Sequence, residues 1–263
     1  MKIAAIMGSP HRGNSYEVTE RIQKKLMGYG NVEFEYIHLK DMDIKPCRGC
    51  FVCFLEGEDH CPLKDDRRLV EEAIEATDGV IFVSPVYSMH ISCLMKLFID
   101  RSAYIFHRPR YFGKCAISLC TTGAVGTKAA LKYLKMVASL WGFNYIGGLG
   151  YVMPPKEMNI APMQGRDRMD SVIKRFYMAI KENHPVRLSL LDHIGFRAMR
   201  EVYLRMEGHS PADYEYWKAK GWFDSKAKYY TDHAKTNPFM GLVARIVARL
   251  VRSRLNKIMN KER

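Results

Sequence analysis

The chain has 263 residues, 48% of them hydrophobic and 26% charged, which is typical of a globular protein with room for one α/β domain and an extension. No apolar run approaches the length of a membrane span, and the first apolar stretch is too short for the core of a signal peptide. We therefore expect a cytoplasmic protein whose seven cysteines serve as thiols, redox groups or metal ligands rather than as structural disulfides. The net charge of +13 is uneven: residues 1–160 carry +3 and residues 161–263 carry +10, which argues against a nucleic-acid-binding first domain.

The opening segment predicts a buried strand, a loop and a helix. Residues 3–7 are all apolar, the run stops at Gly8-Ser-Pro10, and Asn14 or Ser15 can cap the helix that follows. Such a loop suits an anion, because unpaired backbone N–H groups and the positive end of the helix face it. The loop matches neither the Walker A motif nor the dinucleotide motif, and its polar donors suit a terminal phosphate monoester. The alternative is an ordinary strand-to-helix turn.

Strand-like and helix-like segments alternate through the next 120 residues. The expected strands cover residues 32–39, 79–84, 114–120 and 143–150, and the expected helices cover residues 66–77, the surroundings of Leu94 to Ile99, and residues 128–140. This alternation predicts a parallel sheet with helices on both faces. Three short polar loops, at residues 8–15, 84–88 and 121–126, follow strand ends. The carboxyl edge of such a sheet is where ligands bind, so we expect the three loops to form one site.

Five motifs together resemble the flavodoxin-like NADPH-dependent FMN reductase family and, within it, the iron–sulfur flavoproteins. The resemblance covers about residues 1–150. The motifs are Gly8-Ser-Pro10, Gly13-Asn-Ser15, Ser84-Pro-Val-Tyr87, Lys96-x-Phe-Ile-Asp-Arg101 and Thr121-Thr-Gly123. Many relatives carry Arg directly after Gly-Ser-Pro, whereas this chain has His11 and then Arg12.

The resemblance implies a flavodoxin-like, doubly wound, five-stranded parallel sheet of order 2-1-3-4-5 with bound FMN. It implies that the phosphate is held by Ser9, Arg12, Asn14 and Ser15, and that the isoalloxazine is lined by Pro85, Val86, Tyr87 and Ser88 and, from the opposite loop, by Thr121, Thr122 and Gly123. We expect an FMN-dependent oxidoreductase that takes electrons from NAD(P)H and passes them to a small-molecule acceptor or a redox protein. No catalytic acid–base pair is expected, because the cofactor carries the chemistry. The alternative is a non-enzymatic electron carrier of flavodoxin type, and for Tyr87 the alternative is simple core packing.

Four cysteines follow the second expected strand with the spacing C-x2-C-x2-C-x7-C, namely Cys47, Cys50, Cys53 and Cys61. Bacterial ferredoxins use the same first three steps and a Cys-Pro fourth, and the resemblance to iron–sulfur flavoproteins implies that these thiols bind a [4Fe–4S] cluster. Three alternatives stay open: a zinc site, a pair of redox-active thiols, and cysteines that bind no metal.

The alternation ends after residue 152, so we expect a flavodoxin-like domain at residues 1–152 and a helical extension at residues 153–263. Helices are expected at residues 169–180 and 188–204. The aromatic residues between 214 and 230 are expected to dock the extension on the domain or on a second subunit, and the less favoured alternative is a platform on which a substrate stacks. Residues 241–259 predict a basic amphipathic helix that docks on protein or, as the less favoured alternative, lies on an anionic membrane. Its apolar side is formed by Leu242, Val243, Ile246, Val247, Leu250 and Ile258. We therefore expect a homo-oligomer.

Overall fold

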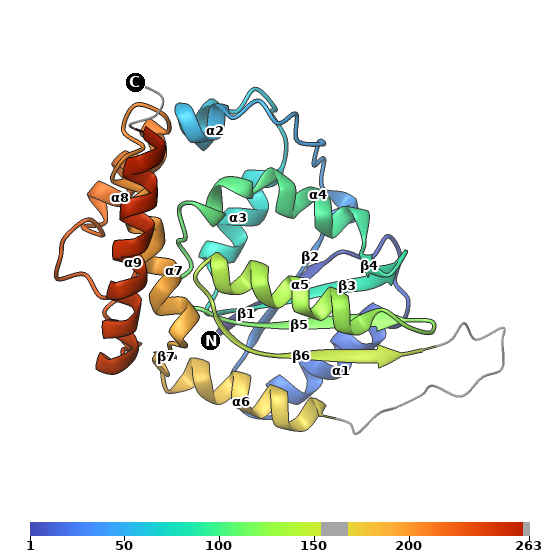
Figure 1. Ribbon diagram of the computed structural model, residues 1–263. Coiled ribbons are helices and arrows are strands. Elements are labelled where there is room, and N and C mark those ends of the chain that lie inside the picture. Colours follow the sequence, from blue (N-terminus) through green and yellow to red (C-terminus); the bar gives the residue numbers. More distant parts are fainter. Residues whose placement is uncertain (154–167, 260–263) are drawn as a thin grey trace. The chain divides into compact units, whose positions relative to one another are not determined.

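The computed structural model describes residues 1–153 and 168–259, which fall into two compact units (Figure 1). The first unit comprises Met1–Arg48 and Leu63–His184, and the second comprises Gly49–Pro62 and Pro185–Arg263. The segment that carries three of the four spaced cysteines therefore belongs to the second unit. Within the described residues, no helix is long and apolar enough to cross a membrane.

The first unit is built on a sheet in which five parallel strands have the order β2-β1-β3-β5-β6. These strands are β1 (Lys2–Met7), β2 (Glu33–His38), β3 (Gly79–Tyr87), β5 (Cys115–Thr122) and β6 (Asn144–Val152). The predicted flavodoxin-like order 2-1-3-4-5 is confirmed. The numbers differ because a two-residue antiparallel strand that was not predicted, β4 (His90–Ile91), pairs with the end of β3.

Helices cover both faces of this sheet (Figure 1). Alternate residues of β3 point to opposite faces, so that Ile81 and Val83 pack with α1 and α6, whereas Phe82 packs edge-on against Trp141 at the end of α5, with ring centroids 6.1 Å apart. The bounds are α1 (Asn14–Met27), α3 (Arg67–Glu75), α4 (Cys93–Arg101), α5 (Thr127–Leu140) and α6 (Met169–Lys181), with single 3₁₀ turns η1 (Leu39–Asp41) and η3 (Ala103–Phe106).

The sheet core extends beyond residue 152, the boundary expected from the sequence. Val172 and Phe176 of α6 are fully buried against the strands, together with the apolar face of α1. The helix packs so closely that a Cβ atom on Gly79 would lie 2.6 Å from Cδ1 of Ile180. This apolar contact explains why α6 belongs to the first unit.

The second unit has an aromatic core of its own. Trp217 is fully buried, and its ring lies 4.8 Å from Tyr203, 5.0 Å from Trp222 and 5.5 Å from Tyr230. The aromatic residues that we expected to dock the extension therefore form the interior of this unit. Its elements are α2 (Val52–Leu55), η2 (Glu58–His60), β7 (Val186–Arg187), α7 (Leu190–Tyr203), α8 (Pro211–Ala219), β8 (Ala234–Lys235) and α9 (Pro238–Met259).

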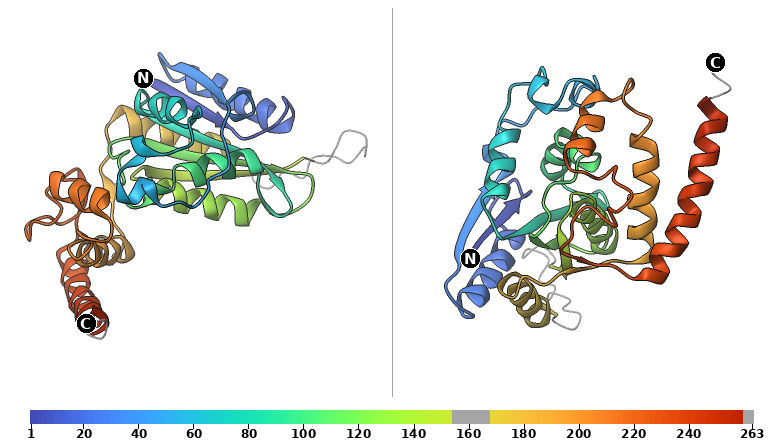
Figure 2. Two further views of the ribbon diagram at one scale, coloured as in Figure 1. Left: turned by 90° about the horizontal axis from the view of Figure 1, so that it is seen from above. Right: turned by 90° about the vertical axis from the view of Figure 1, so that its left-hand side faces the viewer.

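Helix α9 packs along α7 through small residues (Figure 2). Ala244 and Ala248 are buried, whereas Leu242, Ile246 and Leu250 are about half exposed or more. The larger apolar side chains that predicted the packed face of this helix thus form an outward stripe. A buried carboxylate of α7 fixes the pair of helices, because Glu201 accepts two hydrogen bonds from Arg252, at 2.9 and 2.8 Å.

Candidate functional site

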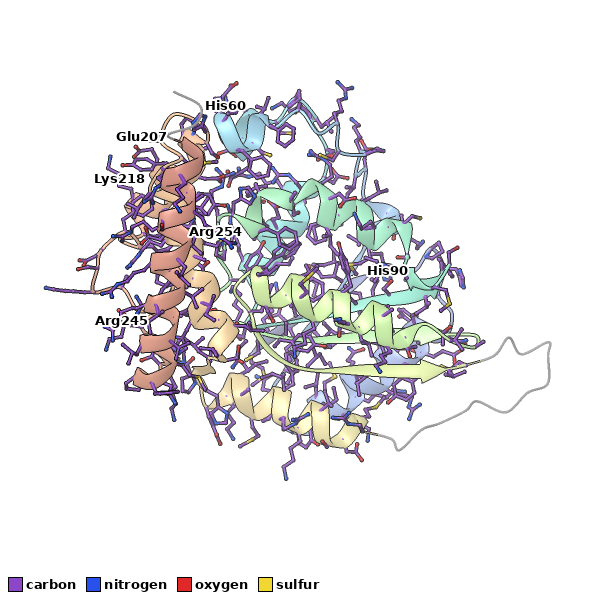
Figure 3. The ribbon with its side chains drawn as sticks, in the orientation of Figure 1. His60, His90, Glu207, Lys218, Arg245 and Arg254 are labelled. Carbon is purple, nitrogen blue, oxygen red and sulfur yellow. The ribbon has the colours of Figure 1, made fainter. Side chains whose placement is uncertain are left out.

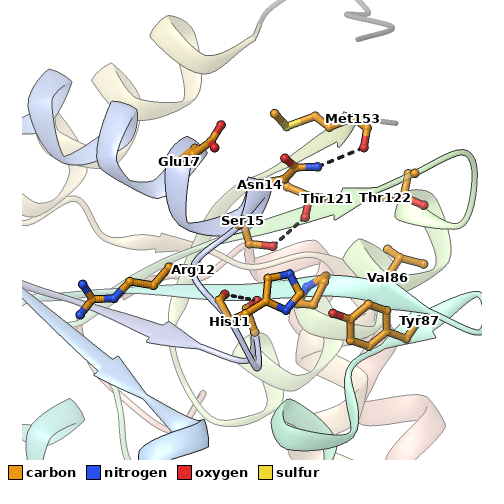
Figure 4. A pocket seen from close by; sticks show the side chains of 14 residues that line it. His11, Arg12, Asn14, Ser15, Glu17, Val86, Tyr87, Thr121, Thr122 and Met153 are labelled. Atoms are coloured by element: carbon orange, nitrogen blue, oxygen red, sulfur yellow. Dashed lines mark hydrogen bonds between the residues drawn. The ribbon is translucent and has the colours of Figure 1, made fainter. Parts of the chain in front are cut away.

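The three predicted loops converge on one cavity of about 470 Å³ at the carboxyl edge of the sheet (Figure 4). Strand register brings them together, because Met7 pairs with Val83 and Pro85 pairs with Thr121. Every predicted flavin-site residue except Ser88 lines the cavity. The complete lining is Ser9, His11, Arg12, Gly13, Asn14, Ser15, Glu17, Pro85, Val86, Tyr87, Thr121, Thr122, Gly123 and Met153.

The N-terminus of α1 opens into this cavity without a side-chain cap. Gly13 is the N-cap residue, and its carbonyl accepts from the backbone N–H groups of Tyr16 and Glu17. The N–H groups of Asn14 and Ser15 have no acceptor within the described residues. A Cβ atom on Gly13 would lie 2.9 Å from the ring of His11, so glycine permits the tight loop. Two backbone donors and a positive helix end therefore face the cavity.

Hydroxyl and amide side chains of the same loop are held in place by the neighbouring loops. The hydroxyls of Ser15 and Thr121 lie 2.6 Å apart, and the side-chain amide of Asn14 donates to the Met153 carbonyl at 3.1 Å (Figure 4). The Ser9 hydroxyl donates to the His11 carbonyl at 2.7 Å. These bonds hold polar groups at the cavity in fixed positions, which favours binding a ligand with little loss of side-chain entropy.

The two basic side chains of the loop differ in direction. The guanidinium of Arg12 points away from the other labelled side chains, whereas the ring of His11 lies among them (Figure 4). Arg12 sits over the Tyr16 ring at 5.2 Å, and Tyr16 in turn packs against Tyr36 at 5.3 Å. The sequence left open which of His11 and Arg12 contacts the phosphate and favoured Arg12, and both side chains line the cavity.

A strained hairpin forms the second wall of the cavity. Ser88 and Met89 connect β3 to β4 with φ angles of 47° and 69°, the left-handed region that a two-residue hairpin turn requires and that costs a non-glycine residue about 1 kcal/mol or more. The turn leaves Tyr87 43% exposed at the cavity, with a flat apolar face available. Burial of the remainder of the side chain raises the pKa of the Tyr87 hydroxyl, so it stays protonated near neutral pH.

A buried serine that the sequence analysis missed ties the first two loops together. The Ser92 hydroxyl donates to the Gly8 carbonyl at 2.6 Å and accepts from the Met95 N–H as the N-cap of α4. The Ser92 N–H in turn donates to Ser84 at 2.9 Å. Gly8 has no room for a side chain, since a Cβ atom there would lie 2.9 Å from Ser92 Oγ. Ser92 stands just before a helix with no motif around it, so only its place as a possible N-cap could have signalled it.

The third loop closes on its own hydroxyl. Thr122 Oγ1 donates to the Val125 carbonyl at 2.7 Å and accepts from the Ala124 N–H. Gly126 follows with φ of 102°, and a Cβ atom there would lie 2.7 Å from Val86 Cγ1. The loop therefore packs directly on the second wall.

The predicted cysteine ligands occupy an accessible segment. Cys47 and Cys50 are exposed, Cys53 and Cys61 are partly buried, and none of the seven cysteines forms a disulfide. Within the described residues, no three His, Cys, Asp or Glu side chains lie close enough together to hold a metal ion. The one-turn helix α2, which carries Cys53, is anchored to α8 because Ser210 donates to the Phe54 carbonyl at 3.1 Å. The four thiols are thus accessible and are suitable metal ligands, but they do not lie close enough together in the described structure to share one metal ion.

Residues 1–156 match the family described as NADPH-dependent FMN reductase. An iron–sulfur flavoprotein of Archaeoglobus fulgidus is 30% identical over 225 residues, which cover 84% of this chain and 99% of that protein. An iron–sulfur flavoprotein of Clostridioides difficile is 28% identical over 76% of this chain and 89% of its own length. Among solved structures, RosB with bound 8-demethyl-8-formylriboflavin-5'-phosphate superposes with a TM-score of 0.55 at 10% identity, covering 70% of this chain and 78% of that one, a likeness of fold.

Proposed function

This chain belongs to the NADPH-dependent FMN reductase family, and we propose that the cavity at the carboxyl edge of its sheet binds FMN with the phosphate at the N-terminus of α1. The protein is an FMN-dependent oxidoreductase. The observation that carries the proposed pose is the pair of backbone N–H groups at Asn14 and Ser15, which lack acceptors among the described residues and open into the same cavity as the Tyr87 ring.

Each wall of the cavity has a separate part in this proposal. Ser9, Asn14 and Ser15 hold the phosphate with neutral donors. Arg12 is assigned to the phosphate because of the family resemblance, and His11 because its ring lies in the cavity lining. Pro85, Val86 and Tyr87 lie along one side of the isoalloxazine, with Ser88 next to them in the hairpin turn, and the loop at residues 121–123 borders the other side. An anchored phosphate and two walls fix the ring, which is the role that a protein plays in flavin chemistry.

FMN supplies hydride acceptance from NAD(P)H and onward transfer of one or two electrons. The protein's part is to orient the ring and keep water from one side of it, for which the 43% exposed Tyr87 ring and the apolar Val86 side chain are suited. Burial raises the pKa of the Tyr87 hydroxyl, which therefore stays protonated near neutrality. We assign no side chain a proton-transfer role.

Steady-state oxidation of NADPH or NADH with a quinone tests this function directly. We expect turnover that depends on added FMN and falls when Tyr87 is replaced by Ala. An exposed aromatic residue outside the cavity, Tyr29→Ala, provides the control. Tight FMN binding without turnover with any small acceptor would favour a flavodoxin-type carrier instead.

We also propose that Cys47, Cys50, Cys53 and Cys61 ligate a [4Fe–4S] cluster, which would supply a one-electron centre. The spacing and the thiol donor set support this, as does the similarity to two iron–sulfur flavoproteins over most of their length. Because the thiols do not converge in the described structure, cluster binding has to reorganise the segment, as expected when metal binding is coupled to folding.

Two features support a cytoplasmic homo-oligomer. None of the seven cysteines forms a disulfide, which suits a reducing compartment. The stripe formed by Phe239, Leu242, Ile246 and Leu250 on α9 is between 49% and 73% exposed, and a second copy of the chain would cover it. The double substitution Ile246→Glu and Leu250→Glu is expected to reduce the molar mass measured by light scattering to that of the monomer, whereas Arg249→Glu on the same helix leaves it unchanged.

A further inference from the structure

A second cavity lies entirely within the second unit, with a volume of about 280 Å³. Its walls come from α7, from the chain around residues 225–228 and from the start of α9. The lining residues are His193, Arg197, Ser225, Lys226, Lys228, Thr236, Asn237, Pro238, Gly241 and Arg245. Four of these carry a positive charge, and none carries a carboxylate.

The floor of this cavity holds two buried side chains with unused donors. Arg197 is 7% exposed, and its buried Nε has no hydrogen-bond partner among the described residues. His193 is 1% exposed, and its Nε2 accepts from the Asn237 N–H at 3.4 Å. A neutral ring that accepts at Nε2 carries its proton on Nδ1, and that buried Nδ1 also lacks a partner. Buried donors are rarely left unpaired, so each points to a missing acceptor.

The rim of the cavity adds exposed cations. Lys226, Lys228 and Arg245 are exposed, and Arg245 projects from the first half of α9 (Figure 3). Helix α9 has 22 residues, and its first N–H groups are capped by Asn237, whose Oδ1 accepts from Phe239 and Met240. The positive end of this helix therefore adds to the field of the side chains.

Among the described residues, no carboxylate forms an ion pair with these four cations. Asp192 accepts from the N–H and hydroxyl of Ser189 in the cap of α7, and Asp224 accepts from the Lys226 N–H. Arg200 next to Arg197 donates to a carbonyl, that of Asp224. Burial and the like charges of Arg200 and Arg245 lower the pKa of Arg197. The site is thus short of negative charge.

We propose that this cavity is a binding site for a phosphate group, held by the guanidinium of Arg197 and the Nδ1–H of His193 at the floor and by Arg245, Lys226 and Lys228 at the rim. A guanidinium beside a neutral N–H donor suits a tetrahedral oxyanion with several acceptor oxygens. The volume leaves room for a small organic group beyond the phosphate. The phosphate is that of a soluble phosphate ester or of a phospholipid headgroup.

Calorimetric titration with inorganic phosphate at low ionic strength tests the site in protein that has been loaded with FMN and freed of excess FMN, because FMN then occupies only the first cavity. We expect saturable binding of one phosphate per chain. Arg245→Gln should weaken it by about tenfold or more, as expected for the loss of a charge-assisted hydrogen bond. Arg249→Gln, an exposed arginine one turn further along α9 and outside the cavity, should leave it unchanged.

A second variant protects the test from a folding artefact. Arg197→Lys keeps the positive charge but removes the planar guanidinium with its paired N–H donors. It should weaken phosphate binding while the circular dichroism spectrum stays unchanged. No saturable binding, or equal weakening by Arg245→Gln and Arg249→Gln, would overturn the proposal. So would phosphate binding that is lost in the Ser9→Ala and Ser15→Ala double variant of the first unit but kept in Arg245→Gln.

The source of the phosphate follows from two further titrations. A lipid headgroup is identified if the protein sediments with phosphatidate vesicles but not with phosphatidylcholine vesicles. Arg245→Gln should then abolish this sedimentation, and added inorganic phosphate should reverse it. Saturable binding of glycerol 3-phosphate without vesicle sedimentation would identify a soluble ester. Both results support a phosphate site, and the absence of both together with the absence of phosphate binding refutes it.

Discussion

The two units gather groups suited to a phosphate in opposite ways. In the first unit the donors are backbone N–H groups and short hydroxyl side chains from loops that leave one edge of a sheet. In the second unit they are four cations and a histidine from separate segments of the chain. Neutral donors fixed by strand register need little ordering when a ligand binds, whereas long charged side chains attract anions from further away but are screened by salt.

The donor groups of the first cavity are held in position before a ligand binds, whereas those of the second unit need the ligand to complete their arrangement. The first cavity has its hydroxyls already hydrogen-bonded to neighbouring loops. The second unit holds buried donors without acceptors and thiols that do not converge among the described residues. The first cavity is therefore preformed, whereas the two sites proposed for the thiols and for the second cavity need a ligand to complete them.

The largest expected effect is the complete loss of iron binding when one of the four spaced thiols is replaced. Anaerobic reconstitution with iron and sulfide is expected to give about four irons per chain. Cys50→Ser should abolish that uptake and leave FMN binding unchanged, because the flavin loops lie in the first unit. Iron analysis and the visible spectrum measure both.

Cys115→Ser provides the control for a thiol outside the segment, since Cys115 is buried in β5 and burial raises the pKa of its thiol to about 12. Stoichiometric zinc without iron, or uptake of neither metal by the wild-type chain, would remove the cluster from the proposed function and leave an FMN reductase.

The preformed phosphate loop gives the next largest effect. Ser9→Ala combined with Arg12→Ala should weaken FMN by about 100-fold, because a hydroxyl and a positive charge beside the phosphate are lost, and should change riboflavin affinity little. Fluorescence titration with both flavins measures the ratio. His11→Ala alone separates the contribution of the imidazole. Equal weakening of FMN and riboflavin would mean that the phosphate lies elsewhere.

Most of the first unit could be predicted from sequence because its signals are local. A buried strand, a polar loop and a helix appear in order along a few residues, and the parallel order of the sheet follows from their alternation. The β3–β4 hairpin could not be predicted, since its turn places Ser88 and Met89 at positive φ without the usual Asn-Gly signal. Ser92 was missed for a similar reason: its role depends on the Gly8 carbonyl, 84 residues away in the chain.

The second unit was harder to predict because its contacts join distant segments. The apolar pattern of α9 predicted that Leu242, Ile246 and Leu250 would pack, yet the packed face uses Ala244 and Ala248, which allow α7 to approach closely. Periodicity identifies a helix but does not say which of two apolar stripes meets a neighbour. The second cavity has no motif at all, since its residues are spread between positions 193 and 245.

The buried carboxylate of Glu201 in the second unit should contribute to the stability of the fold. The side chain of Glu201 is 2% exposed and pairs with Arg252 and Arg205, so Glu201→Gln should lower the free energy of unfolding by about 2 kcal/mol. Glu215→Gln, an exposed partner of Lys218, should change it by less than about 0.5 kcal/mol. Chemical denaturation monitored by tryptophan fluorescence in a Trp141→Phe background reports on this unit, which then contains both remaining tryptophans, Trp217 and Trp222.

The difference in unfolding free energy between wild type and Glu201→Gln should depend on pH with a definite sign. Hydrogen bonds from Arg252 hold the pKa of Glu201 below its ordinary value of 4.5. A depressed carboxyl pKa stabilises the fold above the unfolded pKa, and this contribution is lost as the pH falls through the folded pKa. The gap between wild type and Glu201→Gln should therefore be constant above about pH 5 and narrow below about pH 4. A gap that widens on acidification would contradict the ion pair.

The smallest effect should come from the neutral network of the first unit. Ser92→Ala removes the N-cap of α4 and leaves the Gly8 carbonyl without its donor, and losses of this kind cost about 1–2 kcal/mol of stability. Because Gly8 begins the phosphate loop, the same change should also weaken FMN several-fold while leaving riboflavin nearly unaffected. Ser171→Ala, an exposed serine on α6, is the control and should change neither quantity. Loss of stability without any loss of FMN selectivity would show that the loop holds its shape without Ser92, and that the first site depends on backbone donors alone.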